Sequence, residues 1–117
     1  MLTSVIPKLP FINKNETKEY YIEKLNFKMI SDYGDYFLVE NGPVEIHFFH
    51  FPNLDPKKSD FMIYLCVDSD IENLYEDYQS RGIAIHPNGK LEKKHWGQKE
   101  FSLLDPCGTL LTFGQAV

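Results

Sequence analysis

The sequence predicts an α+β fold built from two copies of one strand–helix–strand–strand–strand unit. Two helix-start signals, at Asn13 and Ser69, lie 56 positions apart. The extended runs that follow the two predicted helices begin at Phe27 and Ile83, which are separated by the same 56 positions. A length of 117 residues suits one domain. We therefore expect a single domain with one unit over about residues 1–58 and the other over about residues 59–117.

In the first unit a helix begins at Asn13 and continues through Leu25. Asn13 and Glu16 have the spacing of a capping box, in which two side chains satisfy free backbone N–H groups of the first turn. Asn41 and Gly42 predict a tight hairpin, because both residue types tolerate positive φ angles. The strands of this unit are expected over residues 4–11, 27–32, 35–40 and 43–49.

In the second unit the helix is expected to begin at Ser69, where Glu72 repeats the capping-box spacing. Leu74 and Tyr78 lie on one face of this helix, and Gly82 ends it, because glycine readily adopts the left-handed conformation of a helix cap. The strands of this unit are expected over residues 61–67, 83–85, 99–104 and 109–113, with a polar segment between the second and the third.

One helix covers only one face of a four-stranded sheet, so each unit leaves the other face bare. The arrangement of the two sheets that we expect follows from this need for cover. We expect two mixed sheets that curve around a shared cavity, within one chain or between two chains. The side chains of the two units barely match, so a chance similarity between two common α+β units is the alternative.

The composition argues against several classes of function. A formal net charge of −5 disfavours binding to the phosphate backbone of nucleic acids. No apolar segment is long enough to span a bilayer and the N-terminus lacks a signal-peptide pattern, so we expect a cytoplasmic location. The two cysteines do not form a disulfide framework. Cys66, in an apolar run, is expected in the core, and Cys107, in a turn, at the surface.

The most specific segment of the chain is WGQKEF (96–101), followed by DPCG (105–108) and a closing apolar strand. This combination resembles the bleomycin-resistance proteins, a branch of the vicinal oxygen chelate superfamily that includes glyoxalases and dioxygenases. The N-terminal run VIPKL (5–9) and the run YYIEKLNF (20–27) resemble the same branch. The resemblance covers nearly the whole chain and agrees with the two-unit pattern.

The resemblance implies a homodimer of βαβββ modules in which the N-terminal strand is exchanged between partners. Pro7 would stand near the start of that strand, although prolines also protect edge strands from aggregation. It also implies a non-catalytic protein that sequesters bleomycin-type glycopeptide antibiotics in a pocket at the dimer interface. No cofactor is expected. Two alternatives remain open: a metal-dependent glyoxalase- or dioxygenase-like enzyme, and a binding module for another small molecule.

Aromatic side chains would stack on the planar rings of such a drug, and acidic groups would attract its cationic tail. For Tyr36 and Tyr64 a place in the core is the alternative. Lysines near the second pocket wall and before Trp96 run against a uniformly acidic groove. The positions that the resemblance assigns to the pocket are Trp96, Tyr36, Tyr64, Phe49, Asp60 and Gly108.

The metal ligands of the superfamily's enzymes map to residues that cannot bind a metal as an imidazole or carboxylate would. The corresponding positions hold Ile6, Phe61 or Met62, and Thr112. His47 lies near a further ligand position, with Glu45 on the same face of the strand. Without the other ligands, a role for His47 in the pocket lining or in structure is favoured, and no metal is predicted.

Overall fold

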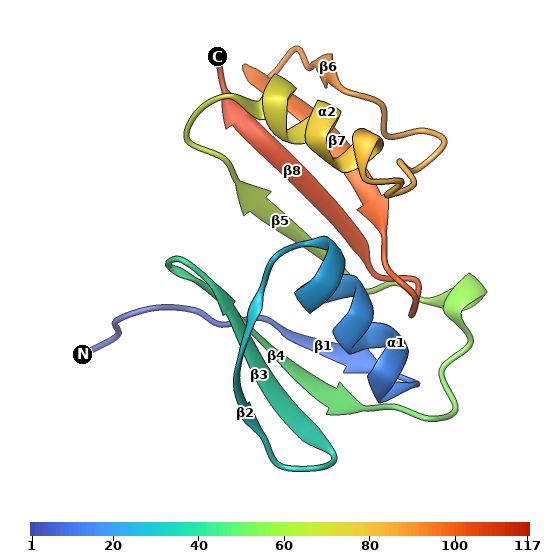
Figure 1. Cartoon of the computed structure of the whole chain (residues 1–117). Helices are drawn as coiled ribbons and strands as arrows, with labels where there is room; N and C mark the ends of the chain where they lie inside the picture. Colours follow the sequence, from blue (N-terminus) through green and yellow to red (C-terminus); the bar gives the residue numbers. More distant parts are fainter.

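A computed structural model describes all residues, 1–117, and shows two four-stranded sheets, each with a helix across one face (Figure 1). Sheet A has the order β1-β4-β3-β2 and sheet B the order β5-β8-β7-β6. The strands of sheet A are β1 (Lys8–Phe11), β2 (Lys28–Asp32), β3 (Tyr36–Asn41) and β4 (Val44–His50). The strands of sheet B are β5 (Met62–Cys66), β6 (Glu92–Lys93), β7 (Gln98–Leu104) and β8 (Leu110–Ala116).

The two sheets have the same topology. The first strand of each half pairs in parallel with the last, β1 with β4 and β5 with β8, and all other pairs are antiparallel. This arrangement confirms the predicted α+β class and its two βαβββ modules with mixed sheets.

The core follows from the alternation of side chains along the strands. On β4, Ile46 and Phe48 are fully buried and face the helix of sheet A, and Phe37 stacks on Phe48 with ring centroids 4.8 Å apart. On sheet B, Phe101 and Phe113 stack in the same way at 4.9 Å. Each half therefore has an aromatic layer between its helix and its sheet.

The first helix begins where the sequence predicts, because the Asn13 side chain accepts a hydrogen bond from the Glu16 backbone N–H at 3.0 Å. An α-helical part, α1 (Lys14–Lys18), continues as a π-helix, η1 (Glu19–Lys24). Asn26, at φ 64°, then ends the helical segment by its left-handed conformation.

The second helix, α2 (Ile71–Ser80), begins one residue later than predicted, because Asp70 and not Ser69 occupies the cap position. The Ser69 hydroxyl donates to Asp68 instead, and Asp70 precedes the helix in a left-handed conformation without a side-chain cap. The free N–H of Ile71 donates to the Gln115 side chain on β8 at 2.9 Å. A tertiary acceptor therefore replaces the predicted local one. The predicted end is confirmed, because Gly82 follows the helix at φ 77°.

The predicted strand at 83–85 is wrong. Ile83 is buried, but the chain there makes no regular ladder, and the only β-pairing of this segment is the two-residue β6 further on. Pro87 lacks the N–H that a ladder needs. Around it, His86 N–H donates to the Ser102 carbonyl, and Ser102 N–H donates to the Gly89 carbonyl. An irregular loop therefore takes the place that β2 holds in sheet A.

The first strand begins at Lys8, four residues later than predicted. The preceding residues 1–7 extend away from the body of the molecule (Figure 1). Val5 is 93% exposed, and the Pro7 carbonyl accepts a hydrogen bond from His47 N–H at 3.1 Å. Only the last part of the N-terminal segment is therefore attached to its own sheet.

Both cysteine predictions are wrong. Cys66 is exposed, because its side chain points to the face of β5 opposite α2. Cys107 is 1% exposed and lies 3.7 Å from the Thr17 hydroxyl. The turn between β7 and β8 packs against the first helix, and this contact buries the thiol and raises the pKa of Cys107.

The same turn joins the two halves of the chain. The Asp105 carboxylate, buried at the start of the turn, accepts a hydrogen bond from the Tyr21 hydroxyl of η1 at 2.6 Å. It also accepts from the backbone N–H groups of Cys107 and Thr109 at 2.8 and 3.0 Å. Burial raises the pKa of Asp105 above its ordinary value, against the opposing effect of these donors. The DPCG motif therefore stabilises the contact between the two halves of the chain.

None of the helices has the length and apolar character that a membrane crossing requires.

Candidate ligand-binding faces

Each sheet has a face without a helix, and most of the predicted site residues lie on these two open faces. Open face A, from β1, β3 and β4, consists of Lys8, Tyr36, Leu38, Glu40, Glu45, His47 and Phe49. Open face B, from β5, β7 and β8, consists of Met62, Tyr64, Cys66, Gln98, Glu100, Ser102, Leu104, Leu110, Thr112, Gly114 and Ala116. The Trp96 side chain, from the loop before β7, joins open face B through Glu100.

The centre of open face B is the carboxylate of Glu100. Its Oε2 accepts a hydrogen bond from the Trp96 indole N–H at 2.9 Å and one from the Tyr64 hydroxyl at 2.9 Å. Glu100 is only 9% exposed, whereas Trp96 is 56% and Tyr64 is 47% exposed. Two accessible aromatic rings are therefore held on either side of a shielded carboxylate.

Gly114 allows this arrangement, because the Tyr64 ring crosses β8 to reach Glu100 on β7. A Cβ atom at position 114 would lie 1.7 Å from the Tyr64 hydroxyl oxygen. Burial, and then the neighbouring Glu100, raise the pKa of Tyr64 to about 12. The phenol therefore stays protonated and donates to the carboxylate throughout the neutral range.

Open face A contains a chain of three polar side chains. The Tyr36 hydroxyl lies 2.8 Å from His47 Nδ1, and His47 Nε2 lies 2.5 Å from Glu45 Oε2. Lys8 Nζ stands 5.6 Å from the centroid of the Tyr36 ring. The same-face spacing of Glu45 and His47 is visible in the sequence, but their contact with Tyr36 needs the pairing of β3 with β4.

Phe49 lies at the end of open face A and belongs to an aromatic group that joins the two halves. Its ring centroid is 6.3 Å from that of Phe51 and 6.0 Å from that of Phe61, which immediately precedes β5. Asp60, next to Phe61, is exposed. These contacts place Phe49 at the connection between the sheets, a segment to which Asp60 also belongs.

Gly108 lies elsewhere, within the turn between β7 and β8. It is buried at φ 80°, and a Cβ there would lie 2.0 Å from the Pro56 carbonyl oxygen. Pro56 begins a short 3-10 helix, η2 (Pro56–Lys58). The space at Gly108 is thus filled by the chain's own backbone and is not open to a ligand.

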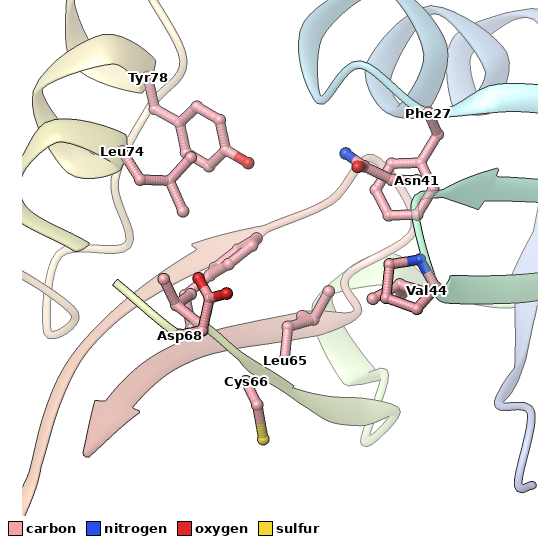
Figure 2. A pocket seen from close by; sticks show the side chains of 11 residues that line it. Phe27, Asn41, Val44, Leu65, Cys66, Asp68, Leu74 and Tyr78 are labelled. Carbon is pink, nitrogen blue, oxygen red and sulfur yellow. The ribbon is translucent and has the colours of Figure 1, made fainter. Parts of the chain in front are cut away.

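Two cavities lie between the halves. The first, of about 430 Å³, lies between α2 and the β3–β4 hairpin, and Figure 2 shows Leu74 and Tyr78 on one side of it and Phe27 and Asn41 on the other. The second, of about 560 Å³, is lined by Val5 and Pro7 of the N-terminal segment, by the start of β4 with Glu45, and by β5 with Tyr64. Of the predicted site residues, Tyr64 alone lines either cavity.

Glu100 and Gln98 were not among the residues predicted for the site. The signal that could have found them is period-two alternation along β7, which places both on the face of Tyr64 once that strand is paired. The sequence prediction included Trp96 of the WGQKEF segment but not Glu100 of the same segment. The carboxylate nevertheless holds the indole in place.

The residues present do not fit the metal of the superfamily's enzymes. Met62 and Thr112 stand on open face B, where imidazole or carboxylate ligands would be needed, and Ile6 stands in the N-terminal segment. His47 has both ring nitrogens engaged, one by Tyr36 and one by Glu45. No three His, Cys, Asp or Glu side chains of the chain come together as a possible metal site.

Comparisons with known proteins agree with this fold. The family model described as "Glyoxalase/Bleomycin resistance protein/Dioxygenase superfamily" matches residues 13–113. A bleomycin resistance protein of Klebsiella pneumoniae is 31% identical over 116 residues, which cover 95% of this chain and 90% of that protein. The bleomycin resistance protein of Geobacillus stearothermophilus is 22% identical over 127 residues, covering 96% of each chain.

Two solved structures are similarly close. A bleomycin-binding protein complexed with bleomycin has a TM-score of 0.87 and 30% identity, and covers 99% of this chain and 100% of its own. A bleomycin resistance determinant encoded on the transposon Tn5 has the same TM-score of 0.87 and 30% identity, with 98% of both chains covered. By its matched family model, its relatives and its two βαβββ modules, this chain belongs to the glyoxalase/bleomycin resistance protein/dioxygenase superfamily.

Proposed function

We propose that this protein binds bleomycin-type glycopeptides and confers resistance to them by sequestration, without catalysis. The observation that carries the proposal is the group formed by Trp96, Tyr64 and Glu100, two accessible aromatic rings on either side of one carboxylate. The similarity to a bleomycin-binding protein complexed with bleomycin, at 30% identity over almost the whole chain, supports the same ligand class.

The chemistry of this group suits a planar ligand with a cationic part. Each stacking or cation–π contact is worth about 1 kcal/mol, so several must converge to give useful affinity. The Glu100 carboxylate adds a charge-assisted partner, which is stronger than a neutral one. Because Glu100 is largely shielded from water, its charge is screened less than that of a surface carboxylate.

Positive charge near the group is partly neutralised. Lys94, two residues before Trp96, forms an ion pair with Glu92, and Lys99 pairs with Glu72 at 2.5 Å. Lys94 is therefore paired and Lys99 lies on the helix-covered face of β7, whereas Lys90 and Lys93 form no ion pair. Part of the positive charge that the sequence places near Trp96 is therefore neutralised.

We propose that a second copy of the chain completes the site. Tyr36 and Phe49 stand on sheet A, while Trp96 and Tyr64 stand on sheet B, so one chain does not gather all four aromatic residues around one cavity. Large apolar side chains on open face B, Met62 at 67% exposure among them, are suited to cover by a partner. Exchange of the exposed N-terminal residues 1–7 would connect the two copies.

The absence of catalysis is proposed from residue chemistry. The positions that would hold the metal of the superfamily's enzymes carry isoleucine, phenylalanine or methionine, and threonine side chains. A cytoplasmic location is proposed with it, because an exposed unpaired thiol such as Cys66 suits a reducing compartment.

The test is a fluorescence titration of the purified protein with metal-free bleomycin. Trp96 is the single tryptophan, so its quenching should saturate at one drug molecule per chain. Glu100→Gln should weaken binding roughly tenfold, since a tenfold change in affinity corresponds to about 1.4 kcal/mol. The matched control is Glu76→Gln, an exposed carboxylate on α2 outside the group, which should bind as the wild type does.

Growth of a sensitive host on bleomycin completes the test. Protection by the wild type and loss of protection by Glu100→Gln are expected. If the titration shows no saturable change and expression gives no protection, the drug assignment is wrong and a binding module for another small molecule takes its place. Stoichiometric zinc, iron, manganese or nickel in the purified protein would instead favour the enzyme alternative.

A further inference from the structure

The Tyr36–His47–Glu45 chain on open face A stands apart from the Trp96 group, and the proposed stacking does not use it. All three side chains are half-buried or partly exposed, and the His47 side chain keeps 19% of its surface accessible. Such a chain determines which of its atoms donate and which accept a hydrogen bond. Tyr36, at one end of this chain, therefore presents a defined chemistry to a ligand.

Glu45 determines the tautomer of His47. An ionised carboxylate only accepts hydrogen bonds, so at 2.5 Å from Glu45 the Nε2 atom of His47 must carry a hydrogen. In the neutral imidazole the other nitrogen, Nδ1, is then an acceptor. The Tyr36 hydroxyl at 2.8 Å must donate to it. With its hydrogen turned inward, the Tyr36 oxygen offers only lone pairs to the open face.

The surrounding charges limit the kind of donor that this oxygen can meet. Lys8, from β1, stands 5.6 Å from the Tyr36 ring and opposes a second cation there. On β3, Glu40 lies on the same face and pairs in register with Glu45 of β4 and Lys28 of β2. Because a cation already lies over the ring, a neutral N–H group such as an amide suits the Tyr36 oxygen better than an ammonium group does.

We propose that Tyr36 is a specificity-determining residue whose phenol oxygen accepts a hydrogen bond from a neutral N–H group of the ligand. Glu45 and His47 are positioning residues that hold the phenol in this acceptor role. The proposal rests on the proposed function and adds to it, since it assigns open face A to an amide-bearing part of the drug. Protonation of His47 reverses the role: Nδ1–H then donates to the Tyr36 oxygen, and the freed phenol hydrogen faces the ligand's own donor.

The experiment compares the bleomycin affinity of the wild type and of Tyr36→Phe by Trp96 fluorescence, at a series of pH values between about pH 5 and pH 8. The ratio of the two dissociation constants removes the titration of the drug itself. We expect Tyr36→Phe to bind five- to tenfold more weakly at the alkaline end and equally well at the acid end. A ratio that stays the same at both ends overturns the proposal.

The positioning role is tested with two further variants. In Glu45→Gln the side-chain amide can donate as well as accept, so Nε2 of His47 no longer has to carry the hydrogen. The effect of Tyr36→Phe measured in this background should therefore shrink at alkaline pH. His50→Gln, on the same strand with its ring stacked on Phe11 on the opposite face, is the matched control and should leave the pH profile unchanged. A pH profile that changes in His50→Gln, or that stays the same in Glu45→Gln, contradicts the proposal.

Nitrogen NMR of the free protein reads the imidazole without any ligand. The neutral form of His47 should be the Nε2–H tautomer in the wild type, and an Nδ1–H tautomer would overturn the proposal by itself. This readout distinguishes the proposed role of Tyr36 from the proposed binding of bleomycin. If the tautomer is as expected but bleomycin does not bind at any pH, the proposed function has failed, and the assignment of Tyr36 to that drug fails with it.

Discussion

The two halves of the chain share a topology but differ in what their open faces present. On open face A an imidazole, His47, stands between a phenol and a carboxylate. On open face B a carboxylate, Glu100, stands between a phenol and an indole. The helix-covered faces, in contrast, are both lined with stacked phenylalanines. The repeat is therefore preserved where burial demands apolar side chains, and the uncovered faces are free to hold different chemistry.

The edges of the two sheets differ as well. β2 is a five-residue strand that pairs with β3, whereas its counterpart β6 has two residues, and the loop before it replaces the ladder with isolated hydrogen bonds. Trp96 reaches open face B from the turn between β6 and β7, after the irregular loop has ended. A turn and not a strand therefore positions the residue on which the proposed function depends most.

The largest effect is expected from breaking the link between the halves. Asp105→Ala leaves the Tyr21 hydroxyl and two backbone N–H groups without their acceptor in a buried place. We expect it to lower the free energy of unfolding by about 3 kcal/mol, as losses of buried hydrogen-bonded partners do. Urea unfolding followed by Trp96 fluorescence and by circular dichroism measures it. Asp68→Ala, at an exposed position, is the control, and equal stability of both variants would contradict the link.

A substitution on β8 should disturb open face B alone. In Gly114→Ala the new methyl group displaces the Tyr64 ring from Glu100, because no room exists for both. We expect bleomycin affinity to fall about tenfold, a loss of about 1.4 kcal/mol, while the helix-covered core remains intact. Calorimetric titration measures the loss. Ala116→Ser, on the same strand and face, should have no effect, and wild-type affinity in Gly114→Ala would remove Tyr64 from the site.

At alkaline pH the buried phenol of the second half should limit stability. Burial raises the pKa of Tyr78 from 10.0 to about 12. The unfolded chain releases this proton at lower pH than the folded chain does, so the contribution is complete below pH 10 and is lost as pH rises toward 12. We expect up to about 2 kcal/mol of pH-dependent loss from this group, and less of it in Tyr78→Phe. The measurement is the free energy of unfolding of the wild type and of Tyr78→Phe as a function of pH. Parallel curves for the two proteins between pH 9 and pH 12 would refute this assignment.

The smallest effect is expected from the exposed ion pairs between helix and sheet, which both halves have. In the first half Asp32 accepts from Lys14 at 2.9 Å and Lys18 at 2.7 Å, and these lysines hold its pKa below the ordinary 3.8. Its contribution is therefore present above pH 3.8 and is lost as pH falls further.

We expect Asp32→Asn to lower the urea midpoint slightly at neutral pH and to match the wild type in strong acid. Glu72→Gln, which removes the counterpart Glu72–Lys99 pair, is the comparison in the second half and should behave alike. A large loss of stability in either variant would contradict the view that these pairs are peripheral.

The sequence predicted the repeated topology well, because this topology depends on the spacing of apolar residues and on the residues that begin and end each element. The Asn13 cap and the Gly82 stop lie where the sequence predicts them. Predictions failed where a distant group replaced a local signal. The Gln115 side chain replaced the Ser69 cap, and packing of a turn against the first helix buried Cys107. Neither contact is visible from neighbouring residues, because its partners are far apart in the chain.

What the sequence alone determined is the order of strands and helices, the apolar faces that they bury, and the family signature around Trp96. Burial of alternating apolar side chains leaves few other ways to fold such a pattern. Only the tertiary structure decided that Glu100 holds Trp96 and Tyr64, that Glu45 and His47 hold Tyr36, and that Gly108 serves packing. Hydrogen bonds across strands depend on register, and register is set by the whole sheet rather than by any one of its segments.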